Sequence, residues 1–262
     1  MVLLIFSIVY YHNLNTVQNF LKCNSAFFKK NSCLILIVNN TIDDISFLNS
    51  DNINVIDAGK NLGYFGAARI ALNHVLKLEL PFDWFIHLNS DLEFAKFNFC
   101  DLIKYEESQS YCIMPRITES HTGIEQNPLY YRKPSLNKIR FLSILTSSSL
   151  LFNFYANFKK IFRLKPKKSN NSKGSYYAPH GAFICLNRTA ISSGVDFHHP
   201  SFLFCEEISL GEQIKRNGVT LVYDESIHIL HDEHDTTGKD WRSSLLCKYH
   251  NASLKMVIKE YY

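Results

Sequence analysis

The 262-residue sequence is poor in the residues that break up or replace a packed core. It has only 10 Gly and 7 Pro, and no internal repeat is visible, which excludes collagen-like, disordered and solenoid chains. The N-terminal apolar run, 1–11, is only about ten residues long and lacks a basic leader, so it fits a buried strand better than a signal peptide or membrane span. Because 46% of the residues are hydrophobic and only 20% are charged, we expect a large core.

The sequence also lacks any Cys-x-x-Cys pair. Its cysteines are odd in number and scattered, and most lie inside apolar runs, which argues against a disulfide framework. We therefore expect buried free thiols in a cytoplasmic protein. The seven are Cys23, Cys33, Cys100, Cys112, Cys185, Cys205 and Cys247.

Acidic residues are missing from one long segment. Between Asn127 and Val195 there is no Asp or Glu but there are twelve Lys or Arg, so a net charge of +4 leaves −8 for the rest of the chain. Within residues 140–168, aromatic and aliphatic residues alternate with the basic ones, which is typical of a helix that lies on an anionic membrane surface. A solvated lid, an insertion packed on the body of the protein, and a nucleic-acid site are the alternatives.

Strand-like and helix-like segments alternate along the first half of the chain, which predicts an α/β protein with a mixed, mostly parallel sheet flanked by helices. No linker separates the halves, so we expect one domain over residues 1–262, with a basic amphipathic insertion at about 132–173. The predicted strands are 2–9, 33–38, 53–56, 84–88, 182–186 and 219–223, and the predicted helices are 15–21, 66–78, 206–216 and 243–259.

Polar residues follow several of these strands, where ligands bind in open α/β sheets. Asp91, in Asn89-Ser90-Asp91, is a suitable ligand for a hard divalent ion, although Asx residues after strands are also common turn formers. The turn from Asn61 to Gly66 allows backbone amides to approach a phosphate, with Arg69 adding positive charge, although close helix packing also explains its small residues.

Two further groups suggest catalysis or metal binding. Glu206 and Glu207 open a predicted helix, where they either complement the helix dipole or direct one carboxylate into a pocket as a general base. His228, His231 and His234 are spaced for a conceivable zinc site, but one histidine completing a metal or pyrophosphate site is the favoured interpretation.

The order of these motifs resembles the family 2 inverting glycosyltransferases of the bacterial cell-surface polysaccharide type. The succession runs through Asn39-Asn40, Asn61-Leu62-Gly63-Tyr64, Asn89-Ser90-Asp91, His180-Gly181, Glu206-Glu207 and His231. The resemblance implies the GT-A fold and a nucleotide-diphosphate-sugar donor. The family usually has Asp-Asn where this chain has Asn39-Asn40, and Asp where it has Glu207.

Carried over by position, the resemblance implies a role for each matching residue. Glu207 is the catalytic base, with Glu206 as the other candidate, and Asp91 and His231 bind Mg2+ or Mn2+. His180 and Gly181 lie on the acceptor side. The donor-binding residues are Tyr11, Asn39, Asn40, Asn61, Gly63, Arg69 and Asn89.

The implied reaction is metal-assisted transfer of a sugar, with inversion, to a saccharide acceptor that is lipid-linked, in O-antigen or capsule synthesis. The implied location is the inner face of the plasma membrane, with no nucleic-acid partner. Two alternatives remain open: a non-catalytic, membrane-associated protein that binds nucleotide sugars, and a nucleotidyltransferase. The latter would have a Gly-rich basic loop after the first strand, where this chain has Tyr10-Tyr11-His12-Asn13.

Overall fold

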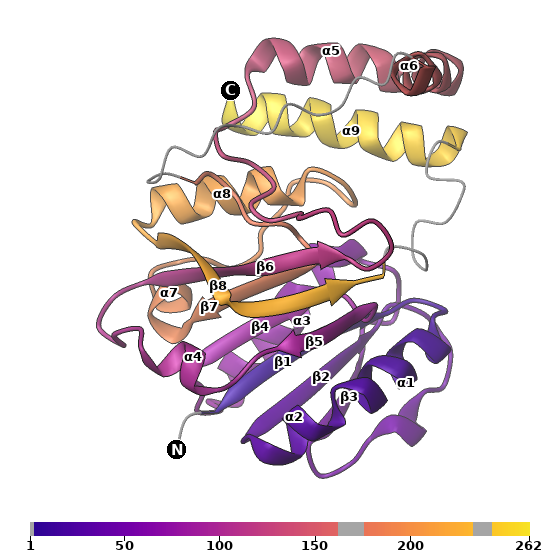
Figure 1. Ribbon diagram of the computed structural model, residues 1–262. Coiled ribbons are helices and arrows are strands. Elements are labelled where there is room, and N and C mark those ends of the chain that lie inside the picture. Colours follow the sequence, from indigo (N-terminus) through magenta and orange to yellow (C-terminus); the bar gives the residue numbers. More distant parts are fainter. Residues whose placement is uncertain (1–2, 162–175, 233–242) are drawn as a thin grey trace.

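Eight strands form one mixed sheet in the computed structural model, which describes residues 3–161, 176–232 and 243–262 (Figure 1). The order across the sheet is β3-β2-β1-β4-β7-β6-β8-β5, and β7 and β5 run against the other strands. The α/β class with a mixed, mostly parallel sheet is therefore confirmed. The strands are β1 (Leu4–Tyr10), β2 (Cys33–Asn39), β3 (Ile53–Asp57), β4 (Trp84–Leu88), β5 (Leu92–Lys96), β6 (Tyr111–Glu119), β7 (Phe183–Asn187) and β8 (Thr220–His231).

Helices cover both faces of the sheet because the inner strands are apolar on both sides. Successive residues of β1 point to opposite faces of the sheet. Phe6 faces a cluster of aromatic rings beneath α1 (Leu14–Cys23) and α2 (Ser25–Lys30), and its neighbour Ile5 faces α3 (Gly63–Lys77). The short helices α7 (Arg188–Ser192) and α4 (Cys100–Ile103) and the 3-10 turn η1 (Ser46–Leu48) complete the connections between strands.

A further layer of helices lies beyond α8 (Glu206–Arg216), at the top of Figure 1. It contains α5 (Leu136–Thr146), α6 (Ser149–Ile161) and the C-terminal helix α9 (Ser244–Tyr261). A small core joins this layer to α8, formed by Ile139, Ile208, Leu254 and Val257 among others. The described part of the predicted basic insertion is thus two helices packed on the body of the protein, and residues 162–173 of it lie outside the described residues.

Most of the predicted segments match observed elements, and α8 has the predicted bounds. Neither β5 nor β6 was predicted from the sequence. The last predicted strand ended at residue 223, whereas β8 continues to His231. All seven cysteines are free thiols, as predicted, and four of them are buried. In the described parts of the chain, no helix is both long enough and apolar enough to cross a bilayer.

Candidate active site

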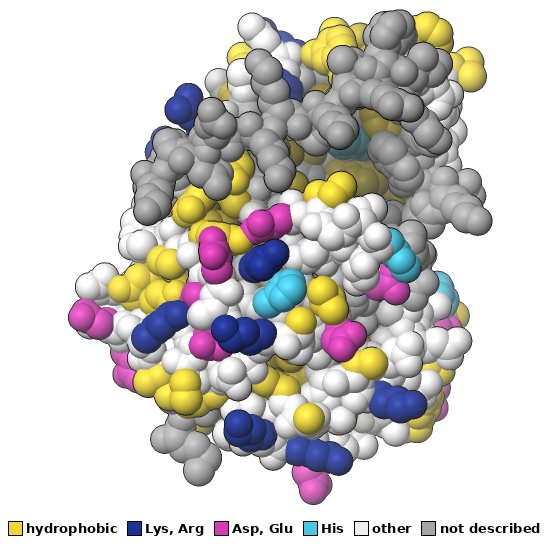
Figure 2. All heavy atoms as spheres, viewed as in Figure 1, with side chains coloured by type: hydrophobic (Ala, Val, Ile, Leu, Met, Phe, Trp, Pro, Cys, Tyr) yellow, Lys and Arg dark blue, Asp and Glu magenta, His cyan; other side chains and the backbone are white. Residues whose placement is uncertain are grey.

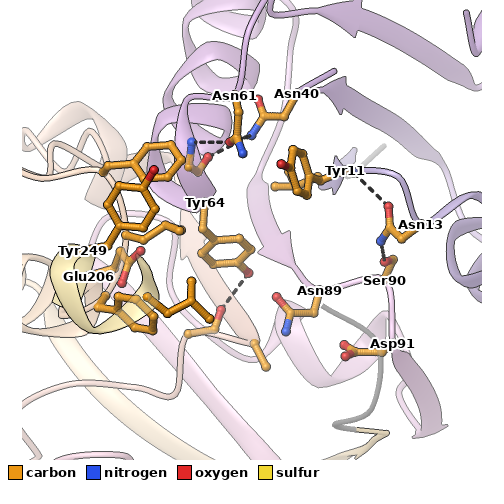
Figure 3. Close-up of a pocket in the computed structure, with 18 of the residues that line it drawn as sticks. Tyr11, Asn13, Asn40, Asn61, Tyr64, Asn89, Ser90, Asp91, Glu206 and Tyr249 are labelled. Atoms are coloured by element: carbon orange, nitrogen blue, oxygen red, sulfur yellow. Dashed lines mark hydrogen bonds between the residues drawn. The ribbon is translucent and has the colours of Figure 1, made fainter. Parts of the chain in front are cut away.

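The strand register gathers polar residues at one edge of the sheet. Tyr10 at the end of β1 lies beside Asn39 at the end of β2, and Ile8 lies beside Leu88 at the end of β4. A cavity of about 790 Å3 opens at this edge (Figure 3). Its described lining residues are Val9, Tyr11, Asn13, Thr16, Asn40, Asn61, Gly63, Tyr64, Asn89, Ser90, Asp91, His180, Gly181, Ala182, Phe202, Leu203, Phe204, Glu206, Glu207, Leu245, Leu246 and Tyr249.

Asn40 and Asn61 order the turn that leads into α3. Asn61 Oδ1 accepts a hydrogen bond from the backbone N–H of Gly63 at 3.0 Å, and Asn40 Nδ2 donates to the Gly63 carbonyl at 3.1 Å. Gly63 has φ +75°, and a β-carbon there would overlap the carbonyl oxygen of Phe202, so only glycine fits this position. The other end of the Asn40 amide, Oδ1, is buried and has no hydrogen-bond partner among the described residues. Asn40 lines the cavity, and its amide fixes the turn on which Gly63 lies.

Asn13 links the end of β1 to the turn after β4. Its Oδ1 accepts a hydrogen bond from the backbone N–H of Tyr11, and its Nδ2 donates to Ser90 Oγ, both at 2.9 Å. This bridge holds the ring of Tyr11 and the Asn89-Ser90-Asp91 turn on the same side of the cavity (Figure 3).

Asp91 and His231 meet because β5 and β8 are antiparallel neighbours, with Leu92 paired to His231. His231 Nε2 lies 3.4 Å from Asp91 Oδ1, and both side chains are almost fully buried. His231 Nδ1 lies 2.7 Å from Gln126 Oε1, an oxygen that accepts the Nδ1 proton. Nε2, on the other side of the ring, faces Asp91 Oδ1, which has no hydrogen-bond partner in the described structure. A carboxylate oxygen and an imidazole nitrogen thus face each other beside the cavity that Asp91 lines.

This pair fits a divalent cation that has further ligands on the substrate. A carboxylate oxygen and an imidazole nitrogen are both suitable for Mn2+, and a carboxylate also suits Mg2+. Within residues 3–161, 176–232 and 243–262, no group of three or more His, Cys, Asp or Glu side chains is arranged to hold a metal. His228 instead contacts Thr118 Oγ1 at 3.0 Å, and His234 lies outside the described residues.

The two carboxylates that open α8 lie on the opposite side of the cavity from Asp91, where Figure 3 shows Glu206 beside Tyr249. Burial, together with the charge of Glu207, raises the pKa of Glu206 to about 8. Burial also raises the pKa of Glu207, but backbone N–H groups, including that of Gly181, hydrogen-bond its carboxylate and oppose the increase. At neutral pH, therefore, Glu206 keeps its proton, and the backbone hydrogen bonds favour the charged form of Glu207.

Tyr64 holds the backbone against which Glu207 rests. Its hydroxyl donates to the carbonyl oxygen of Gly181 at 2.7 Å, and its ring lies 4.2 Å from the ring of His87, centroid to centroid. Burial and the nearby carboxylates keep the pKa of the Tyr64 phenol well above its usual value, so the hydroxyl remains a donor. Tyr64 belongs to the Asn61-Leu62-Gly63-Tyr64 motif, but the sequence alone did not indicate a role for its side chain.

An apolar wall closes the Glu206 side of the cavity. It consists of residues 202–204 before α8 and of Leu245, Leu246 and Tyr249 on α9. The rings of Phe202 and Tyr249 lie 5.1 Å apart. Phe204 and Cys205 both have left-handed backbone (φ +71° and +67°), an unfavourable conformation for non-glycine residues that occurs immediately before the carboxylate pair. This wall was not predicted from the sequence, because part of it is built by α9, which begins 38 residues after Glu206.

The cavity brings together most of the residues singled out from the sequence. Tyr11, Asn40, Asn61, Gly63, Asn89, Asp91, His180, Gly181, Glu206 and Glu207 all line it, and His231 lies directly behind Asp91.

Two predicted donor-binding residues lie elsewhere. Asn39 points into its own loop, where its amide contacts Thr41, Asp43 and Asp57. Arg69 lies on the solvent face of α3 and pairs with Asp196 at 3.1 Å. Neither is among the described lining residues, so neither is kept in the donor site.

No protein-family profile matches the sequence, and no curated protein matches it. Among solved structures, the chain is similar to GalNAc-T7 in a crystal structure with UDP, GalNAc and Mn2+, with a TM-score of 0.57 and 11% identity over 91% of this chain and 44% of that chain. It is also similar to S. aureus TarS 1-349, with a TM-score of 0.52 and 14% identity over 88% of this chain and 60% of that chain. For the same TarS fragment in complex with UDP-GlcNAc, the TM-score is 0.52 and the identity is 13%, over 90% of this chain and 60% of that chain.

These structures are GT-A glycosyltransferases, and the chain spans about half of the length of the proteins that it matches. At this level of identity, the similarity establishes the fold. The protein has the GT-A fold that the sequence resemblance implied.

Proposed function

We propose that the protein is an inverting glycosyltransferase of the family 2 type, which moves a sugar from a nucleotide-diphosphate donor to a hydroxyl of a saccharide acceptor. One observation carries the proposal: a single cavity in a GT-A fold has the Asp91–His231 pair on one side and the Glu206–Glu207 carboxylates on the other. A donor diphosphate needs the first pair, and an attacking hydroxyl needs the second.

The donor nucleoside binds between the carboxyl ends of β1 and β2 in this proposal. The ring of Tyr11 supplies a stacking surface, and Asn40 orders the turn at Gly63 that lines the other side of this pocket. The structure of TarS 1-349 with UDP-GlcNAc, which shares this fold, supports a nucleotide-sugar ligand.

Asp91 and His231 would hold Mg2+ or Mn2+, and Asn89 lies beside them on the cavity wall. Within the described lining there is no Lys or Arg, so these walls have no cationic side chain to offset a diphosphate. A divalent cation, when bound, supplies that positive charge as the nucleoside diphosphate departs. Mn2+ in the GalNAc-T7 structure supports this assignment.

Glu207 acts as the general base. Backbone hydrogen bonds favour the charged form of its carboxylate, and the backbone of Gly181 and the hydroxyl of Tyr64 fix its surroundings. The acceptor hydroxyl gives its proton to Glu207 while its oxygen forms a bond to the anomeric carbon. The bond from that carbon to the donor phosphate oxygen breaks, and the nucleoside diphosphate leaves with the electron pair. A single displacement of this kind inverts the anomeric configuration.

The acceptor enters past His180 and the apolar wall of residues 202–204 and α9. A wall of this composition favours an acceptor with both a sugar and an apolar group, such as a saccharide linked to a lipid diphosphate. Such an acceptor is presented at a membrane surface, which is consistent with a role in O-antigen or capsule synthesis at the inner face of the plasma membrane.

Glu207→Gln is the direct test. We expect this variant to bind UDP and Mn2+ as the unchanged protein does, but to lose sugar transfer by about 10²- to 10⁴-fold, because the hydroxyl proton has no acceptor. Glu225→Gln, at an exposed carboxylate on β8, is the control and should keep full activity. Nucleotide-sugar turnover, measured with and without EDTA, separates this proposal from a non-catalytic binding protein. Turnover that persists at full rate in Glu207→Gln would remove Glu207 as the base.

A further inference from the structure

Helices α5 and α6 carry large apolar side chains on their outer surface. Leu150, Phe154 and Ile144 are 81%, 73% and 65% exposed, and Phe141 and Leu151 are also exposed. We call these five residues the α5–α6 patch. Phe141 and Ile144 lie three positions apart on α5, and Leu150 and Leu151 precede Phe154 by four and three positions on α6, so each helix presents its members on one side. Figure 2 shows hydrophobic side chains at the top of the molecule, where α5 and α6 lie.

The same helices have a second apolar side that is already buried. Ile139 and Leu142 of α5 belong to the small core against α9, and Phe152 of α6 is buried, with its ring 6.3 Å from that of His250. Packing on the body of the protein therefore accounts for the inner side of these helices only. Several large apolar side chains exposed on the outer side of two neighbouring helices are typical of a binding surface.

The charge around the patch identifies the chemistry of its partner. Lys138 and Arg140 are exposed on α5, and Lys159 and Lys160 occupy the last turn of α6 in the sequence. The whole segment between Asn127 and Val195 contains no acidic residue. A partner that is apolar beneath an anionic surface matches this combination, and a bilayer with anionic headgroups has both properties. A nucleic acid would match the charge but not the exposed aliphatic side chains.

We propose that the α5–α6 patch docks the protein on the surface of a bilayer that contains anionic lipids. Phe141, Ile144, Leu150, Leu151 and Phe154 enter the headgroup boundary, while Lys138 and Arg140 contact the headgroups. This inference deepens the proposed function and rests on it for its biological meaning. The docked surface is the one from which the enzyme would reach a lipid-linked acceptor.

The patch is connected to the acceptor side of the cavity through α9. Behind the patch, Phe152 contacts His250 of α9, and the ring of His250 lies 4.9 Å from that of Phe204, which lines the cavity. Leu245, at the start of α9, is both exposed and part of the cavity wall. The bilayer-facing layer and the apolar cavity wall are thus two sides of one packed unit.

The test is co-sedimentation of the full chain with vesicles of phosphatidylcholine alone or of phosphatidylcholine mixed equally with phosphatidylglycerol. We expect binding to the mixed vesicles, weakened by added salt, and little binding to neutral ones. Leu150→Ser/Phe154→Ser should weaken binding by at least about tenfold, because two apolar side chains no longer enter the bilayer. The control is Phe47→Ser/Ile103→Ser, at side chains that are 60% and 56% exposed on other parts of the molecule, and it should bind as the unchanged chain does.

A second pair of variants tests the charge. Lys138→Gln/Arg140→Gln should weaken binding to the mixed vesicles more than Lys29→Gln/Lys30→Gln on α2, which removes the same charge elsewhere. Equal binding to neutral and mixed vesicles, or equal losses in the patch and control variants, would overturn the proposal. Vesicle binding requires no nucleotide. A chain that docks but consumes no nucleotide sugar would therefore uphold the docking surface and refute the glycosyltransferase function.

Discussion

Glu207 packs so closely against Gly181 that a β-carbon on residue 181 would lie 2.9 Å from Glu207 Oε1. Gly181 does not have a left-handed backbone, so the space taken by the carboxylate, and not φ, is what excludes a side chain there. The position of the proposed base is therefore set by a glycine on a different segment of the chain.

Gly181→Ala should displace the Glu207 carboxylate. We expect kcat to fall by about 10- to 100-fold with little change in the KM for the donor, because a displacement of about 1 Å is costly for catalysis. Glu207→Asp removes one methylene and makes room for the new methyl group. In a double-mutant cycle the two changes should therefore be less than additive. Strict additivity of the two effects on kcat would show that Gly181 does not position Glu207.

Tyr64→Phe should affect the same carboxylate indirectly. The variant keeps the ring against His87 but loses the hydrogen bond to the Gly181 carbonyl, which leaves that buried oxygen without its Tyr64 donor. We expect kcat to fall by about five- to tenfold, with donor KM nearly unchanged, and the pH dependence of kcat to shift as the surroundings of Glu207 relax. Tyr105→Phe, which removes the partly buried hydroxyl that donates to Asp224, is the control for a general loss of packing. A matching loss in both variants would indicate a structural role only.

The raised pKa of Glu206 predicts how stability depends on pH. The folded protein keeps a proton on Glu206 up to about pH 8, whereas the unfolded chain releases it near the usual value of 4.5. The contribution of Glu206 to the free energy of unfolding is therefore most favourable below pH 4.5 and declines as the pH rises toward 8.

Glu206→Gln should remove this dependence, because an amide cannot ionise. Thermal unfolding of the variant and the unchanged protein should coincide near pH 5, and by pH 8 the variant should be the more stable by several degrees. Glu225→Gln should track the unchanged protein throughout. A constant difference in melting temperature across this range would contradict the raised pKa.

Asp91→Asn and His231→Ala should each weaken Mn2+ binding, measured by titration calorimetry in the presence of UDP as well as by activity. Gln126→Leu should do so to a smaller extent, by roughly 10-fold, because it removes the contact that places the proton on His231 Nδ1. Asp232→Asn is the matched control, because Asp232 is the next residue along the chain and contacts His121 on the surface. If Asp91→Asn bound Mn2+ and UDP normally, the metal site would lie elsewhere.

The sheet edge could be predicted from the sequence because polar residues follow apolar strands, and parallel strands bring their carboxyl ends together. Asn40, Asn61 and Asp91 were found in this way. The prediction of donor-binding residues was wrong at Asn39, because it depended on the direction in which that side chain points. Asn39 and Asn40 are adjacent and of the same type, yet only Asn40 lines the cavity. The Asn39 amide instead makes three hydrogen bonds within its own loop and one to Asp57 at the end of β3.

Pairing between strands far apart in the sequence was the second feature that could not be predicted. The strand β6 contains Pro115 and Arg116, which interrupt its apolar pattern, and its neighbours in the sheet, β7 and β8, lie some 70 to 110 residues away in the sequence.

The periodicity of α3 shows which side of the helix packs on the sheet, with Phe65, Ala68 and Leu72 buried. It does not reveal that Arg69, on the solvent side, pairs with Asp196.

The described residues that line the cavity come from two separate parts of the chain. Those up to Asp91 form the side assigned to the donor, and those from His180 onward form the side assigned to the acceptor, with none between. Under the proposed function, changes confined to residues 202–204 and to the first turns of α9 should alter which acceptor binds while Asp91, His231 and the nucleotide side stay intact. Libraries at these positions are therefore the direct route to new acceptor specificities.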